Sequence, residues 1–461
     1  MTLKNPFNTI EEVLCWVKKR NDEVNVKVER ISFEKMDNWG LDKKKGSLRH
    51  SSNKFFSIQG LEVTTNYGHK KTWDQPIINQ PEIGYLGFIT KLFNGILYFL
   101  VQTKIEPGNV NYVQLSPTIQ ATKSNYTQVH GGEIPNYLEY FMCAKKNEIL
   151  LDQLQSEQGA RFLKKRNRNI IIKVDKELEI LKDFKWLTLG QIKFLMKMDN
   201  VINMDTRTVI SGISFGDYPK RALDFHKIMS FEDKSIPNKL LSSALINNQS
   251  FVSFKQIIYW LTAHKVKYEL SLKTKSLASL KDWKITNSII EHKDRRFFKV
   301  IGVNVEIGNR EVTSWHQPLI EPCDEGICAF IIKEIDGILH FLVQAKLEAG
   351  NFDIVEIAPT VQCSSVYSED KKEQDKIPFL KEILNAKPEQ IIFDTLQSEE
   401  GGRFFREQNR NILIELGDDF STKVPENYIW LTLNQLKRLI VFNNYVNIQA
   451  RSLIAALPYN N

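Results

Sequence analysis

Four polar side chains that can bind or react occur in one short segment: Gln102, Lys104, Glu106 and Asn109. The segment follows an apolar run and contains Gly108, and such exits from a rigid strand often display ligand-contacting groups. A carboxylate there can move a proton, and a lysine or an amide can stabilise an oxyanion. Two structural alternatives stay open. Lys104 and Glu106 share one face of a strand and could pair with each other, and Asn109 could satisfy its own turn.

Further candidates for acid and base chemistry follow along the chain. Glu157 and Arg161 are spaced as i, i+4 after Ser156, a good N-cap, so we expect a short helix that begins at Ser156. The alternative for this pair is an ordinary surface ion pair. Tyr126 and His130 lie in a polar loop and could also move protons, since histidine titrates nearest to neutral pH. The alternative for this histidine is a structural or merely exposed side chain.

Two tryptophans and two arginines are candidates for binding. Trp73 and Trp315 lie in Trp-x-Gln-Pro segments with polar neighbours, where an indole can stack on a base or a sugar. Arg168 and Arg410 lie in Asn-Arg-Asn segments, and a guanidinium grips a phosphate or a carboxylate with two hydrogen bonds. The basic run that starts at Lys164 has no equally basic counterpart before Arg410, which argues against a nucleic-acid patch.

The candidates recur because the chain is a tandem repeat. Trp73 and its segment return 242 residues later at Trp315. At the same offset the other candidates have these counterparts: Gln102 and Gln344, Lys104 and Lys346, Glu106 and Glu348, Asn109 and Asn351, Thr118 and Thr360, Gln120 and Gln362, Glu157 and Glu399, Arg161 and Arg403, Arg168 and Arg410. A period this long indicates duplication of a whole domain, because solenoid units are far shorter.

We therefore expect two domains of similar fold, residues 1–214 and 251–461. Residues 215–250 connect them, because Gly216, Pro219 and Pro237 interrupt the pattern there and the stretch has no counterpart in the other copy. Its apolar residues suggest short helices rather than a bare linker.

Each copy is predicted to be mixed α and β with a largely antiparallel sheet. Asn94-Gly95 and Asp336-Gly337 separate apolar runs and supply the positive φ angles of a tight hairpin turn. Strands are expected at 113–115 and 170–174, and in the second copy at 354–357. Thr188 with Gln191, and Thr432 with Gln435, predict capping boxes at the start of a further helix in each copy.

Composition excludes several classes of protein. Hydrophobic residues make up 42% and charged residues 25% of the 461, which is typical of a globular chain. The net charge of +7 is too small to demand nucleic acid or an anionic membrane. We expect a cytoplasmic location, because no run is long enough to span a membrane and the start does not resemble a signal peptide. The five cysteines and eight histidines show no metal-ligand spacing, and no dinucleotide or P-loop motif occurs, so no metal and no cofactor is predicted.

Four segments together resemble the NDP-hexose 2,3-dehydratases of deoxysugar biosynthesis. They begin at Trp73, Leu100, Gln114 and Leu154, and read WxQP, LVQxKxEPGN, QLSPTxQATxSNY and LQSExGxRF. The resemblance spans nearly the whole chain, including its duplication. It implies two Nudix-like domains, a homodimer, a nucleotide-sugar pocket in each domain, and dTDP-4-keto-6-deoxyglucose as the substrate.

The implied reaction suggests roles for the candidates. A base removes the proton on sugar carbon 3, which the ketone at carbon 4 acidifies, and an acid helps the carbon 2 hydroxyl to leave. The product is a 3,4-diketo-2,6-dideoxy sugar nucleotide. Acid and base are sought among Glu106, Tyr126, His130 and Glu157, with Lys104 among the catalytic residues. The remaining candidates are predicted to bind substrate: Trp73, Gln102, Asn109, Thr118, Gln120, Arg161, Arg168, Trp315, Gln344, Lys346, Glu348, Asn351, Gln362, Glu399, Arg403 and Arg410.

The choice of catalytic copy stays open at this level. We favour the first copy, because the second has Ala349 in place of Pro107 and lacks the Ser-Asn-Tyr stretch that includes Tyr126. The second copy keeps its Ser-Glu segment around Glu399 and could serve instead. A Nudix-type diphosphohydrolase and a non-catalytic sugar-nucleotide binder are the two alternative functions, and the first of these would need clustered carboxylates for Mg²⁺ that the sequence lacks.

Overall fold

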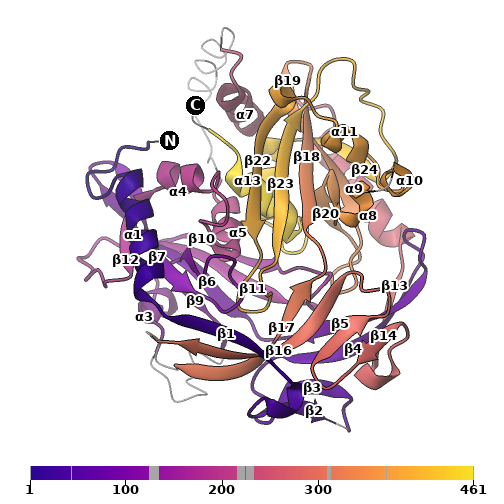
Figure 1. Ribbon diagram of the computed structural model, residues 1–461. Helices are drawn as coiled ribbons and strands as arrows, with labels where there is room; N and C mark the ends of the chain where they lie inside the picture. Colours follow the sequence, from indigo (N-terminus) through magenta and orange to yellow (C-terminus); the bar gives the residue numbers. More distant parts are fainter. Residues whose placement is uncertain are drawn as a thin grey trace.

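A computed structural model describes residues 2–42, 44–123, 134–214, 224, 233–308, 313–369 and 371–459. Tyr126 and His130 lie outside this part of the chain. Two large mixed sheets dominate the fold, one in residues 1–214 (the first half) and one in residues 251–461 (the second half), with two smaller sheets beneath them in Figure 1. This confirms the predicted class of two similar mixed α/β units. The connection at 215–250 stays a prediction.

The two large sheets have the same topology. The first runs β10-β11-β6-β7-β12, with β8 beside β7 and β9 beside β6; the second runs β22-β23-β18-β19-β24, with β20 and β21 in the corresponding places. Only the β11–β6 and β18–β23 pairs are parallel among the described ladders of these sheets. The strands are β6 (Gly84–Phe93), β7 (Ile96–Ile105), β8 (Val113–Ser116), β9 (Ile119–Ala121), β10 (Ile149–Ser156), β11 (Arg166–Lys173), β12 (Phe184–Thr188), β18 (Gly326–Ile335), β19 (Ile338–Lys346), β20 (Glu356–Pro359), β21 (Val361–Ser364), β22 (Ile391–Ser398), β23 (Gln408–Glu415) and β24 (Tyr428–Thr432).

Local sequence signals fold as expected. The β6–β7 and β18–β19 hairpins turn at Asn94-Gly95 and Asp336-Gly337, all with positive φ. Both predicted capping boxes form, at Thr188 with Gln191 and at Thr432 with Gln435.

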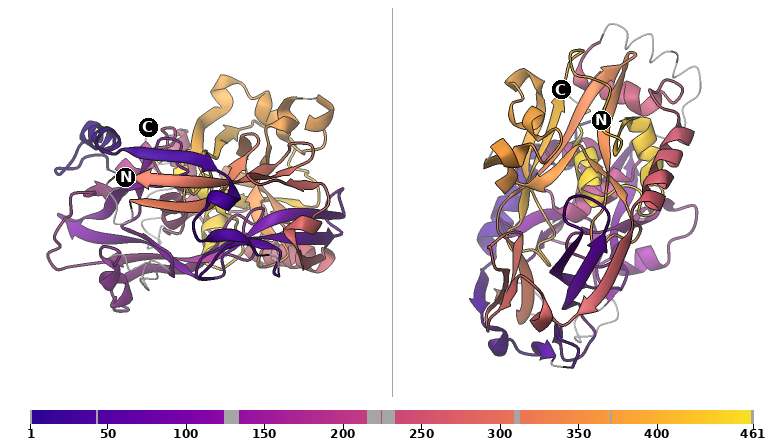
Figure 2. Two further views of the ribbon diagram at one scale, coloured as in Figure 1. Left: turned by 60° about the horizontal axis from the view of Figure 1, so that its bottom comes forward. Right: turned by 90° about the vertical axis from the view of Figure 1, so that its right-hand side faces the viewer.

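Each small sheet borrows a strand from the other half. The strand β1 of the first half pairs with β16 of the second, and β13 of the second half pairs with β4 of the first. In Figure 2 (left) the indigo strand β1 lies along the orange strands of the second half. The strands are β1 (Val26–Ile31), β2 (Trp39–Asp42), β3 (Ser47–His50), β4 (Ser57–Thr65), β5 (Thr72–Asn79), β13 (Leu270–Lys275), β14 (Trp283–Ile285), β15 (Ile289–His292), β16 (Phe298–Ile307) and β17 (Ser314–Pro322). The halves are therefore interlocked rather than merely adjacent.

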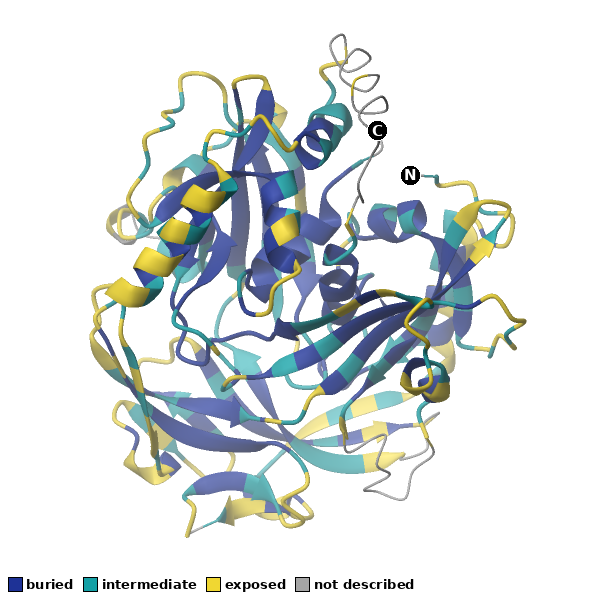
Figure 3. Cartoon of the chain, turned by 180° about the vertical axis from the view of Figure 1, so that it is seen from behind, coloured by how far each residue is buried: buried dark blue, intermediate teal, exposed yellow. Residues whose placement is uncertain are grey.

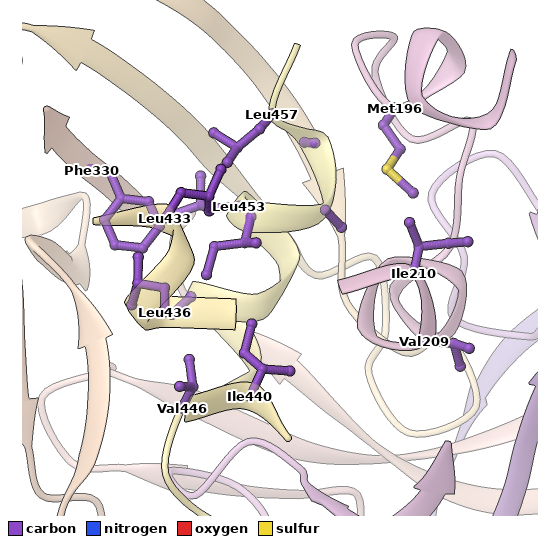
Figure 4. Close-up of a cluster of buried hydrophobic side chains, with 14 of the residues drawn as sticks. Met196, Val209, Ile210, Phe330, Leu433, Leu436, Ile440, Val446, Leu453 and Leu457 are labelled. Carbon is purple, nitrogen blue, oxygen red and sulfur yellow. The ribbon is translucent and has the colours of Figure 1, made fainter. Parts of the chain in front are cut away.

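Helices fill the space between the large sheets. One apolar cluster includes Val209 and Ile210 from α5 together with Leu453 from α13, and Figure 4 labels these residues among the buried side chains of the cluster. The cluster is buried in Figure 3, where exposed residues gather on loops and outer helix faces. The helices are α1 (Ile10–Glu23), α3 (Leu138–Met142), α4 (Leu189–Leu195), α5 (Met204–Ser211), α7 (Ile236–Leu245), α8 (Phe254–Lys267), α9 (Val366–Glu369), α10 (Lys371–Gln374), α11 (Leu380–Leu384), α12 (Leu433–Ile440), α13 (Ile448–Ala456), and the 3₁₀ turns η1 (Phe33–Lys35), η2 (Leu277–Ser279) and η3 (Pro388–Gln390).

The short helix predicted to begin at Ser156 is absent, and this expectation was wrong. Ser156 is the last residue of β10, and residues 157–162 form a turn in which Phe162 N–H donates to the Gln158 carbonyl at 2.8 Å. The Ser156 hydroxyl donates to Glu356 of the second half at 2.8 Å instead of capping a helix. Tertiary contact across the halves thus replaced the local capping interaction.

The turns 157–162 and 399–404 each reach into the other half. Gly108 N–H donates to the Gly401 carbonyl at 2.8 Å, and Gly350 N–H donates to the Gly159 carbonyl at 2.6 Å. A Cβ added at Gly108 would lie 1.7 Å from the Phe404 carbonyl oxygen, so only glycine fits there. The repeated Gly-Asn of each copy therefore serves contact between the halves.

Two buried arginines hold these turns from below. Arg207 of α5 donates to the Ser398 carbonyl, and Arg451 of α13 donates to the Ser156 carbonyl, both at 2.6 Å. Each guanidinium is almost fully buried, and hydrogen bonds to main-chain carbonyls satisfy donors that would otherwise be costly. The sheets, helices and arginines together fix each turn against the opposite half.

Candidate active site

A cavity of about 760 Å³ lies between the first large sheet and the turn 399–404. The first half contributes residues of β7 and β9 and of the small sheet, and the second half contributes residues of β17 and of that turn. The site is therefore composite, as a direct result of the interlocked halves.

The end of β7 supplies the floor of the cavity. Gln102, Lys104 and Glu106 all line it, as does Gln120 on β9. Gln120 donates from Nε2 to Glu106 Oε1 at 2.9 Å, and Asn203 donates to Gln120 Oε1 at 3.1 Å. The Asn203 bond fixes the orientation of the Gln120 amide, because its oxygen must face Asn203 and its NH₂ group must then face Glu106. This holds the Glu106 carboxylate in place.

Three candidates from this region make hydrogen bonds to the backbone of their own half, and two of them, Gln102 and Thr118, also line the cavity. Gln102 donates to the Pro117 carbonyl at 2.7 Å, and the Thr118 hydroxyl accepts from Ile89 N–H at 2.9 Å. Asn109 donates to the Tyr112 carbonyl at 2.7 Å, which is the turn-satisfying alternative that the sequence left open. These side chains shape the segment that carries Lys104 and Glu106.

The second half supplies the opposite wall. Trp315 donates to Gln317 Oε1 at 2.8 Å, and Gln317 donates to the Gly402 carbonyl at 2.9 Å. The Arg403 guanidinium lies 4.1 Å from the centre of the Phe56 ring and donates to Gln80 Oε1 at 3.0 Å. Trp315 and Arg403 thus share the cavity with Glu106, although the sequence repeat had grouped Trp73 and Arg161 with it.

Trp73 and Arg161 belong to the corresponding framework of the second half. Gln75, bonded to Trp73, donates to the Ala160 carbonyl at 3.1 Å, and the Arg161 guanidinium lies 4.4 Å from the centre of the Phe298 ring. There Gln362 donates to Glu348 Oε1 at 2.9 Å, the counterpart of the Gln120–Glu106 bond. The remaining second-half candidates keep local contacts: Gln344 to the Pro359 carbonyl, Lys346 to the Gln362 carbonyl and Asn351 to the Lys346 carbonyl.

Glu157 and Glu399 lie behind the cavity lining rather than in it. Asn167 donates to Glu157 Oε1 at 2.7 Å, and Gln158 donates to Glu399 Oε2 at 2.5 Å. Burial raises the pKa of Glu157 to about 8 and that of Glu399 to about 7. Glu157 and Arg161 do not pair with each other; Arg161 approaches Glu407 of the second half at 3.6 Å.

Arg168 and Arg410 lie away from the cavity lining. Arg168 donates to Asp152 at 2.6 Å on one surface, and Arg410 pairs with Asp394 on the corresponding surface. The Asn-Arg-Asn segments are strands β11 and β23, on which alternate side chains face opposite ways. The flanking asparagines point inward, so the arginine between them points out.

Several charged residues of the cavity lining were not among the candidates from sequence, and three of them have shifted pKa values: Lys165, Asp205 and Glu400. Burial, with the charge of Glu106 adding to it, raises the pKa of Glu400 to about 7. Burial, followed by repulsion from Glu400, raises the pKa of Asp205 well above its usual range. Burial lowers the pKa of Lys165, whose ammonium donates to the Glu82 carbonyl. The cavity can therefore hold both a protonated and an ionised carboxyl group near neutral pH.

A difference between the repeats was the signal that could have found these residues. Where the first cavity has Lys165, Asp205 and Glu400, the second framework has Glu407, Gln449 and Gln158. The repeated motifs do not include these three positions, because the two copies differ there.

The described residues show neither a membrane-spanning helix nor a cluster of metal ligands. Their helices are too short or too polar to cross a membrane. In that part of the chain, no group of three or more His, Cys, Asp or Glu side chains is arranged to hold a metal ion.

Comparison with known proteins gives a consistent result. The sequence model of a family described as NDP-hexose 2,3-dehydratase matches residues 10–213 and 254–457. A dTDP-4-dehydro-6-deoxy-α-D-glucopyranose 2,3-dehydratase of Saccharopolyspora spinosa is 43% identical over 97% of this chain and 90% of its own length. Enzymes of the same description from Amycolatopsis orientalis and Streptomyces violaceoruber are 40% and 39% identical, over 97% and 96% of this chain and 90% and 96% of their own lengths.

Among solved structures, a crystal structure of an ADP compounds hydrolase aligns with 38% of this chain and 92% of its own length. It is 17% identical with a TM-score of 0.23, a similarity too low to establish a shared fold.

Proposed function

This chain belongs to the NDP-hexose 2,3-dehydratase family, and we propose that it eliminates water across carbons 2 and 3 of dTDP-4-keto-6-deoxyglucose in the cavity of the first half. The substrate is the one in the relatives' names, in which "4-dehydro" and "4-keto" describe the same ketone. The activity is that of a hydro-lyase.

The reaction needs three kinds of group. A base removes the proton on carbon 3, and the electron pair moves toward the ketone oxygen on carbon 4 to give an enolate. The enolate then expels the carbon 2 hydroxyl, which leaves as water after it receives a proton. The resulting enol at carbon 3 takes a proton at carbon 2 and loses its own hydroxyl proton, which gives the 3,4-diketone.

The observation that carries the proposal is the convergence of Lys104, Glu106 and Gln120 with Trp315 and Arg403 on one cavity. We assign the Lys104 ammonium to the developing enolate oxygen, because a preorganised cation there stabilises the transition state more than the ground state. Arg403 is suited to the diphosphate, since a guanidinium can grip two of its oxygens. Trp315 and Phe56 offer rings against which a thymine or a sugar can pack.

The test is to incubate the purified protein with dTDP-4-keto-6-deoxyglucose in deuterated water and to follow the sugar nucleotide by mass spectrometry. We expect loss of one water, with deuterium retained in the product at carbon 2. Release of dTMP would instead identify a diphosphohydrolase, and binding without any change of mass would identify a sugar-nucleotide binder. Either result would refute the proposal.

A homodimer and a cytoplasmic location remain part of this proposal. Light scattering of the purified chain tests the first, and fractionation of expressing cells tests the second. A monomer would refute the homodimer, and recovery of the chain with the membrane fraction would refute the cytoplasmic location.

A further inference from the structure

We propose that Asp205 and Glu400 are a catalytic pair, one from each half, which act as acid and base of the elimination. The inference rests on the proposed function and names two reacting groups for it. Neither residue was expected from the repeated motifs.

Both carboxylates line the same cavity. Asp205, on α5, is 2% exposed, and Glu400 lies in the turn 399–404 opposite it. A Cβ added at Gly402 would lie 3.1 Å from Glu106 Oε1 and 3.4 Å from Glu400 Oε1, so these two carboxylates flank one point of the backbone. The charge of Glu400 is the strongest charge acting on Asp205.

The two carboxylates also differ from their acidic neighbours in having no hydrogen-bond donor among the described residues. Glu106 accepts from Gln120, Glu157 accepts from Asn167, and Glu399 accepts from Gln158. Those three carboxylates accept hydrogen bonds from the protein, whereas Asp205 and Glu400 line the cavity without such a bond among the described residues. A carboxylate that is buried without a donor is costly in the folded state, and such cost is common where a residue serves function rather than stability.

The second half provides an internal control. It keeps the counterparts of Lys104, Glu106 and Gln120, but has Gln449 and Gln158 where the first cavity has Asp205 and Glu400. Gln158 uses its amide to donate to Glu399 at 2.5 Å. An amide has almost the shape of a carboxyl group but cannot accept or release a proton, so the two substitutions remove proton transfer and leave the framework in place.

The stereochemistry of the substrate constrains how it can lie between the two groups. In a gluco-configured ring, the hydrogen on carbon 3 and the hydroxyl on carbon 2 project from the same face. The base and the acid must then both reach that face of the sugar, so the proposal requires this face to be turned toward Asp205 and Glu400, which line the one cavity from the two halves.

The pair balances the protons of a full turnover. Glu400 begins as the carboxylate and takes the proton from carbon 3, while the C3–H electron pair forms the enolate. Asp205 begins protonated and gives its proton to the departing hydroxyl as the C2–O bond breaks. The proton on Glu400 exchanges with solvent, Glu400 then gives a proton to carbon 2, and the enol hydroxyl gives its proton to Asp205, so both groups recover their starting states. The deeper burial of Asp205 favours its neutral form and supports this order of roles.

The experiment compares Glu400→Gln and Asp205→Asn with the matched control Gln449→Asn, using substrate that carries deuterium on carbon 3. Glu400→Gln is expected to lose at least about 100-fold in both deuterium release and water loss, in line with removal of a general base. In Asp205→Asn, the rate of water loss is expected to fall by a similar factor, while deuterium is still released. Gln449→Asn is expected to keep the rates of the unaltered chain.

Two further measurements separate chemistry from folding. Both variants are expected to unfold at a temperature no lower than that of the unaltered chain, and to bind dTDP as it does. Glu400→Asp, which keeps a carboxylate, is expected to recover at least tenfold over Glu400→Gln; equal losses in the two would overturn the assignment of Glu400. Turnover by Glu400→Gln and Asp205→Asn near the unaltered rate would overturn the pair alone, whereas no water loss by the unaltered chain would overturn the proposed function itself.

Discussion

The first cavity and its counterpart framework in the second half share their main hydrogen bonds and differ in their titratable side chains. Both use a glutamine to hold a glutamate, as in Gln120–Glu106 and Gln362–Glu348, and both hold a turn of the other half by a glycine and a buried arginine. Three charged residues of the first cavity differ from their counterparts: Lys165, Asp205 and Glu400 are replaced by Glu407, Gln449 and Gln158. The two halves therefore share the contacts that fix the turns, and they differ at the two carboxylates that we propose to transfer protons.

The largest effect that would test this comparison concerns the repeated lysines. We expect Lys104→Met to lower kcat by about 100- to 1000-fold, because it removes a preorganised charge at the enolate oxygen. Lys346→Met should lower kcat far less. Steady-state kinetics with dTDP-4-keto-6-deoxyglucose measures both, and the reverse ranking would place the reaction in the second half.

The repeated glycines should show symmetry instead. Gly108→Ala and Gly350→Ala would each place a Cβ 1.7 Å from a carbonyl oxygen of the other half, Phe404 or Phe162. We expect each to lower the free energy of unfolding by about 1 to 3 kcal/mol, because the backbones must move apart. Urea titration followed by circular dichroism measures this. A large difference between the two variants would contradict the shared contacts.

The pH dependence of stability should show the cost of a carboxylate at Glu400, where the other copy has the amide of Gln158. The pKa of Glu400 is raised to about 7 in the fold from about 4.3 in the unfolded chain, so its ionisation destabilises the fold increasingly between these values and fully above pH 7. Glu400→Gln should therefore raise the free energy of unfolding at pH 8 by about 1 to 3 kcal/mol and leave it nearly unchanged at pH 4. Denaturation at both pH values provides the comparison. A variant less stable than the unaltered chain at pH 8 would contradict this account.

The smallest effect is expected at the outward-facing arginines. Arg168→Met and Arg410→Met each break a pair with Asp152 or Asp394 at the surface, and such pairs contribute less than about 1 kcal/mol. We expect KM to change by less than about twofold in either variant, because neither side chain lines the cavity. A tenfold rise of KM in Arg168→Met would instead support the prediction from sequence that Arg168 binds the substrate.

Several features could be predicted because they depend on neighbours in the chain. The turns at Asn94-Gly95 and Asp336-Gly337 follow from residues that tolerate positive φ, and the capping boxes at Thr188 and Thr432 follow from reciprocal bonds over three residues. The helix expected at Ser156 failed because its hydroxyl found Glu356 of the other half, a partner that no local pattern announces.

In the candidate site, too, the residues that could be recognised from sequence are those in local motifs. The residues on β7 and β9 were recognised, because repeated polar residues after a hairpin are visible in one chain. Trp315 and Arg403 were recognised as candidates, but their place in the cavity of the first half could not be read from spacing, because it depends on contacts between the halves. Asp205 and Glu400 were missed because neither belongs to a motif that both copies share.

The sequence alone determined the duplication, the local turns and caps, the family resemblance and the polar residues at the end of β7. These are properties of residue type and short spacing, or of similarity along the chain. Only the tertiary structure decided which turn faces which sheet, and hence which charges meet in the cavity. That decision depends on backbone contacts and strand pairs between residues far apart in the chain, and their energies are set by packing in three dimensions rather than by sequence neighbours.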